Sequence, residues 1–428
     1  MLIEFSVTNY RSILERQTLN MAASSYFKEL ELLNTFIPDQ DDGVPRLLRS
    51  TVLYGPNASG KSTLIQALRF VEQQVLNSQK ESQAGDPIDV VPFKLTSESR
   101  AADSEFEVTF VEQGVRYEYG FRCNRVRFTE EWLFAYPVGR AQKWFHRVLD
   151  AKAGKDVYKF SSSFLGGKTR HDLWKEQTRP NALFFSTAIQ LNNEQLKSAF
   201  DWFKSRLRII DSTQTLEAGY TVVRCKESAD MQKILAFMNS ADLSIADIQL
   251  KTEVFSPEFL PHVLPASFRE EFTKKMAGKE LTSVKFLHTN VDGHGSTEFD
   301  EDEESDGTRA LFAFAGPWLD VIEKERVLVV DELDTSLHPM LVHHLVKRLH
   351  HEGTKAQLIF TTHDTTLLSQ KLLRRDQVWF MEKDKRSATR LYPLSDFSPR
   401  DNEAVERGYL NGRYGGIPFL KDLDFYGV

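Results

Sequence analysis

A short run near the start of the chain has the residue types and the spacing that hold a phosphate group. It matches the pattern G-x-x-x-x-G-K-[ST] and is followed by Thr63. Its members are Gly55, Pro56, Asn57, Ala58, Ser59, Gly60, Lys61 and Ser62. The glycines let such a loop wrap so that backbone N–H groups and a helix N-terminus face the phosphates. We expect Lys61 to reach the β- and γ-phosphates and Ser62 to ligate Mg²⁺.

An acidic pair far down the chain supplies the partner that such a P-loop needs for its metal ion. Asp331 and Glu332 follow the apolar run 327–330, which is typical of a strand that is buried on both faces. We expect Asp331 to hold Mg²⁺ through water. Glu332, one residue further on, should point elsewhere and polarise the attacking water as a general base.

A histidine follows the next apolar run. His363 comes after two threonines at the end of 357–361, where a hydrogen bond to the γ-phosphate would let it sense that group. A strand-end histidine that stands alone is more often structural, but its place in this series favours a functional role. The sequence therefore predicts Lys61, Glu332 and His363 as the catalytic residues of a nucleoside triphosphate site.

These residues depend on strands and helices that bring them to one place. Residues 51–54 have the pattern of a strand that leads into the loop, and apolar residues at helical spacing follow between positions 64 and 71. Between 106 and 148, short alternating runs separated by Gly, Asn and Pro indicate an antiparallel meander. Residues 172–246 have the three-to-four spacing of helices.

The distance in sequence between Lys61 and Asp331 indicates that a large insertion separates the two halves of the site. We predict an α/β fold in three parts. Residues 1–170 form an N-terminal half with the P-loop and the antiparallel β meander. Residues 171–290 form a mainly helical inserted lobe, and residues 291–428 form a C-terminal half with the acidic pair and His363.

Composition excludes several classes of protein. The 428 residues carry 54 Lys and Arg against 61 Asp and Glu, an ordinary globular balance with a net charge of −7. Cys123 and Cys225 are the only cysteines, so neither a disulfide framework nor a multi-cysteine metal site is possible. The start lacks the pattern of a signal peptide, and the apolar stretch 310–319 is about half of the roughly 20 residues that span a bilayer. We expect a soluble, cytoplasmic protein without membrane association.

Taken together, the motifs resemble those of the ABC-type ATPases of the SMC, RecF and OLD branch. They are more similar still to the stand-alone AAA-family ATPases of bacterial abortive-infection and restriction-associated loci. The resemblance extends to Trp132-Leu133, to Ala241-Asp242-Leu243 with Ile245, and to the tail 408–415 (GYLNGRYG), for which the sequence indicates no role. The motifs that carry it are Asn9-Tyr10-Arg11-Ser12, GPNASGKST, Ser305-Asp306-Gly307-Thr308-Arg309, VLVVDELDTSLHP and TTH.

The resemblance implies an ABC-type ATPase head that binds ATP and Mg²⁺ and dimerises head to tail, with two ATP molecules between the heads. Ser305, Gly307 and Thr308 would be the signature element, aimed at the γ-phosphate bound by the other subunit. An N-cap role for Ser305 is compatible with this assignment. Arg11 would contact phosphate, although a surface salt bridge is an equal alternative. Residues 334–338 would form the D-loop.

For function, the resemblance implies an ATP-hydrolysing switch. It would act as a homodimer or higher homo-oligomer and control a separately encoded effector, a nuclease or toxin, in anti-phage defence. The alternative is a RecF-like ATPase that binds DNA in recombination or repair. The net charge argues weakly against a broad nucleic-acid-binding face, yet Arg122, Arg125 and Arg127 remain a possible local basic patch. The stretch after His363 is too short for a nuclease domain of its own.

The acidic run 300–304 lies next to the proposed signature element. Carboxylates beside a triphosphate would repel it, so we expect this run to point away from the nucleotide or to contact a cationic partner. A solvated face is the simpler interpretation.

Overall fold

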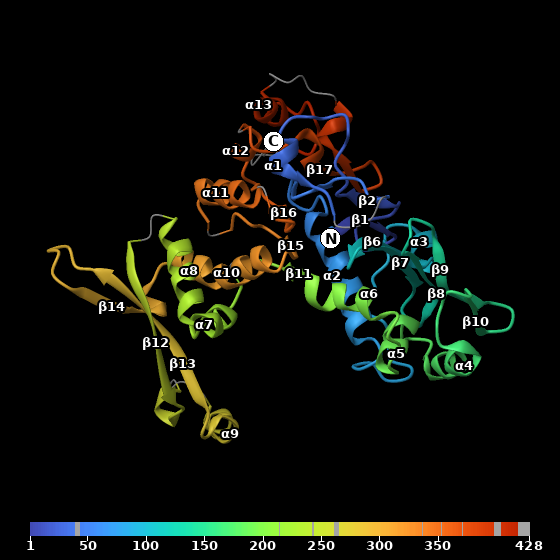
Figure 1. Ribbon diagram of the computed structural model, residues 1–428, viewed down its shortest axis with the longest axis horizontal. Coiled ribbons are helices and arrows are strands. Elements are labelled where there is room, and N and C mark those ends of the chain that lie inside the picture. Colours follow the sequence, from blue (N-terminus) through green and yellow to red (C-terminus); the bar gives the residue numbers. More distant parts are fainter. Residues whose placement is uncertain are drawn as a thin grey trace, which may run out of the picture. The chain divides into compact units, whose positions relative to one another are not determined.

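The computed structural model describes residues 1–38, 43–213, 215–241, 244–260, 265–335, 337–351, 353–369, 371–397 and 404–417 (Figure 1). Contacts divide the chain into two compact units. We call them the head unit (Met1–Ser212, Val321–Asp334 and His338–Val428) and the inserted unit (Thr213–Asp320 and Thr335–Leu337). Asp242 and Leu243 of the family-like motif, and Ser336 of the expected D-loop, lie outside the described residues.

A mostly parallel sheet forms the centre of the head unit. Its strand order is β11-β15-β16-β5-β17-β18, and only the pair β17 and β18 is antiparallel among the described strands. Every residue of β5 (Ser50–Tyr54), β15 (Val327–Val330) and β16 (Gln357–Thr361) is buried, which explains the apolar residues at their centres. The other strands are β11 (Leu207–Ile210), β17 (Val378–Lys383) and β18 (Thr389–Pro393).

The register of these strands places the chemically interesting residues at one edge. Val330 of β15 is opposite Phe360 of β16, and Thr361 is opposite Leu53 of β5. Because the strands are parallel, the P-loop, the acidic pair and His363 all follow strands that end on the same side. This is the edge at which open α/β sheets bind their ligands.

The second sheet of the head unit is the expected antiparallel meander. Its order is β10-β9-β8-β7-β6-β1-β2. Alternate residues of β6 are buried, so one face of the strand covers the core. The bounds are β1 (Leu2–Thr8), β2 (Gln17–Asn20), β6 (Ser104–Glu112), β7 (Val115–Cys123), β8 (Phe128–Tyr136), β9 (Gln142–Asp150) and β10 (Lys155–Phe160). The predicted α/β fold with an antiparallel β subdomain is confirmed.

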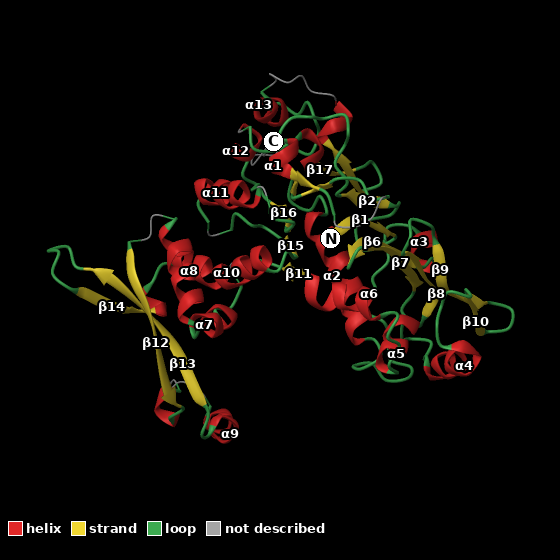
Figure 2. Cartoon of the chain, in the orientation of Figure 1, coloured by secondary structure: helices red, strands yellow, loops and turns green. Residues whose placement is uncertain are grey.

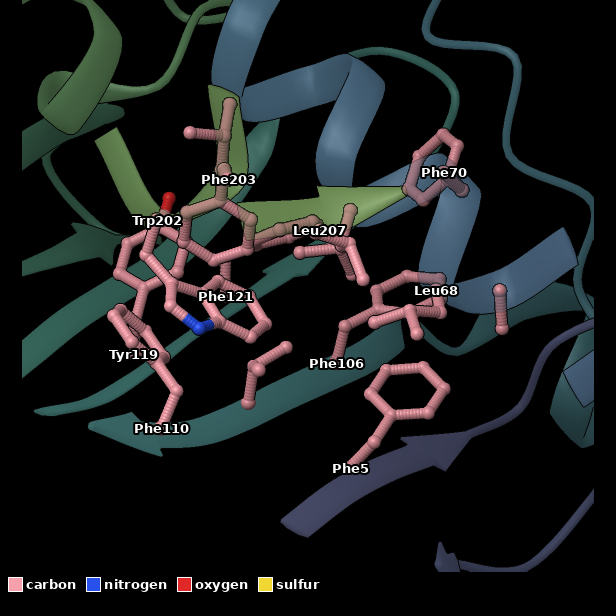
Figure 3. Packing of buried hydrophobic residues seen from close by; sticks show 14 of the residues in the cluster. Phe5, Leu68, Phe70, Phe106, Phe110, Tyr119, Phe121, Trp202, Phe203 and Leu207 are labelled. Atoms are coloured by element: carbon pink, nitrogen blue, oxygen red, sulfur yellow. The ribbon is translucent and has the colours of Figure 1, made fainter. Parts of the chain in front are cut away.

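One aromatic core joins the two sheets to the helix that follows the P-loop, α2 (Lys61–Asn77). Phe70 of α2 lies 5.0 Å from the ring of Phe106 on β6, centroid to centroid. Further along β6, Phe110 stacks on Trp202 at 4.3 Å (Figure 3). Each fully buried ring of this kind contributes on the order of 1.5–3 kcal/mol through the hydrophobic effect. The core therefore anchors the helix whose first turn carries Lys61.

The boundary expected at residue 171 does not coincide with the start of the inserted unit. Helices α4 (Gly167–Gln177), α5 (Phe184–Gln190) and α6 (Lys197–Asp201), and a π-helical turn (Trp202–Arg206), belong to the head unit. The reason is packing, because aromatic residues of this segment join the main core. These residues are Trp174, Phe184, Phe185, Phe200, Trp202 and Phe203.

The inserted unit contains a sheet as well as helices (Figure 2). Its strands β12 (Ile245–Val254), β13 (Glu280–Thr289) and β14 (Ser296–Asp300) pair antiparallel in that order. Thus residues 171–290, which were expected to be mainly helical, also contain β12 and β13, and only the strand over 245–254 was not predicted from the sequence. Exposed residues occupy most of its C-terminal half, so the alternation that marks a half-buried strand is weak. The helices are α7 (Gly219–Cys225), α8 (Ser228–Asn239), α9 (Ala266–Met276) and α10 (Asp306–Glu323) as far as Asp320.

The remaining elements are short or lie at the periphery. They are α1 (Glu31–Asn34), β3 (Thr35–Phe36), β4 (Leu47–Leu48), α3 (Ser97–Ala101), α11 (Pro339–Leu349), α12 (Thr366–Ser369) and α13 (Val405–Leu410). Among the described residues, no helix is both long and apolar enough to cross a membrane.

Candidate nucleotide-binding site

The P-loop connects β5 directly to α2, as the sequence predicts. Gly60 has a φ of 112°, a backbone conformation that other residues rarely adopt. A Cβ atom at Gly60 would also lie 2.3 Å from Oγ1 of Thr389, so a side chain cannot fit there. Thr389 in turn donates a 2.8 Å hydrogen bond to the carbonyl of Ser59, and its hydroxyl lies 2.8 Å from that of Ser12. Residues from both ends of the chain therefore fix the end of the loop.

Lys61 lies against the loop that precedes it. Its Nζ donates hydrogen bonds to the carbonyls of Gly55 at 2.7 Å and Pro56 at 3.3 Å, and the residue is only 7% exposed. Burial lowers the pKa of Lys61, whereas the nearby carboxylates of Asp331, Glu332 and Asp334 act in the opposite direction. Those carboxylates are thus close enough to influence the lysine charge. The structure brings Lys61 and the acidic pair together.

The loop offers groups that fit a polyphosphate. Among the described residues, the hydroxyl of Ser59 is one of the few buried side-chain polar atoms without a hydrogen-bond partner. The N-terminus of α2 begins at the next positions and presents backbone N–H groups that no preceding turn satisfies. With a buried lysine beside them, these groups form a cationic, donor-rich cradle that is suited to an anion with several oxygens.

The acidic pair is oriented by a threonine on the neighbouring strand. Thr361 of β16 donates a 2.6 Å hydrogen bond to Oδ1 of Asp331, and its Oγ1 accepts one of 2.7 Å from the backbone N–H of Glu332. Asp331 is buried, while Glu332 is exposed and has a φ of 54°. A positive φ in a glutamate is uncommon, and such strain is concentrated at functional sites. The backbone reversal gives the two neighbouring carboxylates different surroundings.

His363 lies at the same edge and is tied to the acidic segment through its backbone. Its N–H donates a 3.1 Å hydrogen bond to Oδ2 of Asp334, and the His363 residue itself is exposed. The other oxygen of Asp334 is buried and has no hydrogen-bond partner among the described residues. Asp334 therefore couples the position of His363 to the turn that follows β15.

Arg11 lies beside the P-loop helix. Its Nη1 donates a 2.9 Å hydrogen bond to Gln66 on α2, and its Nε donates one of 3.2 Å to the hydroxyl of Tyr10. Both partners are neutral. A surface salt bridge, the alternative role for Arg11, would require a carboxylate, and none pairs with it in the described part of the chain. The neighbouring Ser12 donates a 3.2 Å hydrogen bond to Thr63. This arrangement keeps Arg11 near the loop, whereas a contact with phosphate stays a prediction.

The proposed signature element forms a capped helix start in the inserted unit. Oγ of Ser305 accepts a 3.1 Å hydrogen bond from the N–H of Thr308 and lies 2.9 Å from the Thr308 hydroxyl. The N-cap alternative for Ser305 therefore describes its local role. Gly307 lies between them in the first turn of α10. Its N–H belongs to the first turn, where the helix leaves backbone donors that a phosphate could use.

The acidic run 300–304 is partly neutralised within the inserted unit. Asp300 forms an ion pair with Lys285, and Glu304 lies 2.5 Å from Nε2 of His288. Glu303 accepts a 2.7 Å hydrogen bond from the N–H of Asp300 in a reciprocal capping arrangement. The run is therefore not simply a solvated face, because two of its carboxylates contact side chains of β13.

Three residues that contact this site were given no role of their own from the sequence. Thr361 sits in the apolar run before His363, and its polar character at a buried strand end is a usable signal. Tyr54, the last residue of β5, and Thr389, on β18, carry no local signal, because their contacts join segments that are distant in the chain.

Comparison with protein families identifies the chain. The profile of the family described as "AAA domain, putative AbiEii toxin, Type IV TA system" matches residues 50–369, which include the P-loop, the acidic pair and His363. The chain belongs to this AAA family. The predicted resemblance to the AAA ATPases of abortive-infection type is thereby confirmed.

Other comparisons are more distant. The SMC head domain from Thermotoga maritima is 12% identical, with a TM-score of 0.39 over 92% of this chain and 98% of that one. An SMC head bound to the C-winged helix domain of ScpA is also 12% identical, with a TM-score of 0.38 over 93% of this chain and 99% of that one. No curated protein matches the chain.

Proposed function

We propose that this AAA protein binds ATP with Mg²⁺ and hydrolyses it. The observation that carries the proposal is that buried Lys61 lies within electrostatic reach of Asp331 and Glu332 at the carboxyl edge of one parallel sheet. A glycine loop with a buried lysine and an acidic pair is the set of groups that a triphosphate and its magnesium ion require. The family to which the chain belongs supports the same activity.

Each part of the site has a distinct task in this proposal. The loop amides and Lys61 hold the phosphates, while Ser62 and, through water, Asp331 hold Mg²⁺. The metal ion supplies charge neutralisation on the β- and γ-phosphates. Glu332 accepts a proton from the attacking water, and His363 donates a hydrogen bond toward the γ-phosphate.

ATP turnover by the purified protein tests this assignment. We expect Lys61→Ala to lose turnover and ATP binding, because the lysine charge is removed. Glu332→Gln should lose turnover but keep ATP, because the amide still accepts a hydrogen bond without taking the proton. The exposed residues Lys80 and Glu81 offer matched controls, as Lys80→Ala and Glu81→Gln. Turnover that is undiminished in both site variants would refute the assignment.

We also propose that two copies close around ATP, with Ser305, Gly307 and Thr308 of one copy facing the nucleotide of the other. The start of α10 supports this role, because the first turn of a helix leaves backbone N–H groups that the helix itself does not satisfy. ATP should then convert Glu332→Gln from monomer to dimer in light scattering. A Glu332→Gln protein that binds ATP and stays monomeric would contradict the proposal.

The biological role that we propose is control of a separately encoded effector, a nuclease or a toxin, in anti-phage defence. Its support is the family description, which names a putative AbiEii toxin and a type IV toxin–antitoxin system. Co-purification of the tagged protein with the product of a neighbouring gene, with and without ATP, is the test. Recovery of recombination proteins instead would favour the RecF-like alternative.

DNA binding is not favoured at the one basic patch that the sequence suggests. Arg122 lies 2.7 Å from Glu105 and 3.2 Å from Glu130. Arg127 lies 2.6 Å from Asp156. These pairings neutralise two of the three cations that would contact a phosphate backbone, and Arg125 is the third, exposed member of the patch.

A further inference from the structure

The C-terminal tail motif packs against the nucleotide edge of the head unit. Its helix α13 lies beside α12, the helix that begins shortly after His363 (Figure 1). Tyr409 of α13 stacks on Phe380 of β17, with 5.2 Å between ring centroids. The same ring lies 5.7 Å from that of Tyr54. The motif without an assigned role therefore contacts the strand that leads into the P-loop.

Tyr54 connects the P-loop strand to the segment that carries His363. It is the last residue of β5, immediately before Gly55, and is almost completely buried. Its hydroxyl donates a 2.9 Å hydrogen bond to the carbonyl of Asp364. One side chain thus spans the distance between the start of the loop and the residue that follows His363.

A second contact joins the tail to this segment. Oε1 of Glu406, on α13, accepts a 3.0 Å hydrogen bond from the hydroxyl of Thr365. The His363 N–H is already bonded to Asp334. Residues 363–365 are therefore held by one contact from the acidic segment, one from the P-loop strand and one from the tail.

The composition of the tail motif follows from how it folds. A Cβ at Gly408 would lie 2.7 Å from the ring of Tyr414, and one at Gly415 would lie 2.4 Å from the hydroxyl of Tyr392. Gly415 also has a φ of 67°. The Tyr409 hydroxyl donates a 2.8 Å hydrogen bond to the carbonyl of Gly416, which closes the turn on itself. These contacts make the motif a compact support for the Tyr409 ring.

We propose that the C-terminal motif, together with the rest of α13 (Val405–Leu410), is a positioning element for His363. Tyr409 holds the Tyr54 ring in place, Tyr54 holds Asp364, and Glu406 holds Thr365. Together they set where the His363 backbone lies relative to the P-loop. The inference rests on the proposed role of His363 in ATP hydrolysis, and it assigns Tyr54, Glu406 and Tyr409 as positioning residues. A small displacement of a catalytic group lowers the rate of the chemical step more than it lowers the affinity for the substrate.

The first test separates kcat from nucleotide affinity. We expect Tyr54→Phe and Glu406→Ala each to lower kcat about tenfold, with ATP affinity changed less than about twofold. Glu406→Gln keeps an acceptor for Thr365 and should restore most of the rate. Tyr409→Ala, which removes the ring that packs on Tyr54, should lower kcat as well. Equal losses in affinity and kcat, or no rescue by Glu406→Gln, would overturn the proposal.

The second test combines these changes with His363→Ala. If the motif acts through His363, Tyr54→Phe should lower kcat no further in the His363→Ala background. Additive losses would show that the motif acts elsewhere.

A third measurement does not depend on ATP turnover. Amide hydrogen exchange at residues 362–366 should accelerate in Tyr54→Phe and Glu406→Ala, and not in Glu406→Gln. Unchanged exchange in both would reject the positioning role even in a protein that hydrolyses ATP. If wild type shows no turnover, the proposed function fails, and the exchange rates still decide whether the motif positions this segment.

Discussion

The hydroxyl of Thr361 donates a 2.6 Å hydrogen bond to Asp331 across two neighbouring parallel strands. The same oxygen accepts the N–H of Glu332. A single side chain therefore sets the direction of the carboxylate that we assign to Mg²⁺ and the backbone of the proposed general base.

Replacement of this hydroxyl should impair turnover. Thr361→Val keeps the shape but leaves the Glu332 N–H without its acceptor and frees Asp331, so we expect kcat to fall about tenfold, equivalent to roughly 1.4 kcal/mol. Thr361→Ser keeps the hydroxyl and should retain most of the rate. Steady-state ATPase kinetics at saturating Mg²⁺ check this. Equal rates for the valine and serine variants would contradict it.

Mixing two inactive variants tests the head-to-tail arrangement. Lys61→Ala disables the P-loop, and Ser305→Arg blocks the signature element. In a mixed dimer one of the two composite sites keeps both intact parts, so an equimolar mixture should recover about a quarter of wild-type turnover. Each variant alone stays inactive and serves as the control. A mixture that stays as inactive as its components would count against shared sites.

Buried His350 predicts a pH effect on stability. Burial lowers its pKa to about 3, with the nearby Arg49 charge acting in the same direction, and its Nε2 lies 2.7 Å from the Ser50 hydroxyl. The unfolded chain takes up a proton below its usual pKa of 6.5 while the folded state does not. The contribution of neutral His350 to the free energy of unfolding is therefore fully present above pH 6.5. It is lost as the pH falls toward 3.

The variant His350→Gln should remove this dependence. Below pH 6.5 the free energy of unfolding of wild type should fall relative to the variant by up to about 1.4 kcal/mol per pH unit. Urea unfolding at pH 7.5, 6 and 5 measures the difference. If the difference in the free energy of unfolding between the two proteins is the same at all three pH values, His350 does not take up a proton on unfolding as proposed.

The buried carboxylate of Glu131 on β8 should be essential for stability. It accepts hydrogen bonds from the N–H groups of Phe184 at 2.7 Å and Phe185 at 2.9 Å, and it lies 3.7 Å from the fully buried guanidinium of Arg147. We expect Glu131→Ala to cost about 3–5 kcal/mol, because it leaves the two buried N–H groups without an acceptor and removes one of the two carboxylates near Arg147, which keeps its 2.8 Å ion pair with Asp156. Thermal unfolding would show this. Glu131→Gln keeps one acceptor oxygen and should lose less stability than Glu131→Ala. A larger loss in the glutamine variant would refute the explanation.

Much of the candidate site could be predicted because its chemistry is contiguous in the sequence. Lys61 and Ser62 belong to one loop, and Asp331 and Glu332 are neighbours after an apolar run. The structure brings Lys61, Asp331 and Glu332 together at one sheet edge, since parallel strands end on the same side.

The remaining features depend on contacts that no local pattern encodes. Nothing near Thr389 indicates that it fills the space beside Gly60, and nothing near Glu406 indicates that it reaches Thr365. The ribbon strand over 245–254 was missed because most of its outer half is exposed. The boundary near residue 171 was placed too early, because the aromatic residues that follow it pack into a core built mainly by the preceding strands.

The place of β5 in its sheet has a consequence for how the protein is made. Its hydrogen-bonded neighbours are β16 and β17, which are both synthesised long after it. While the nascent chain emerges, the P-loop sequence is present but its strand has no partners, and Thr389 has not yet been added beside Gly60. Pairing of such distant segments is slow relative to local folding. We therefore expect a chain that ends before β16 not to bind ATP, because the strand that carries the P-loop would lack both of its neighbours.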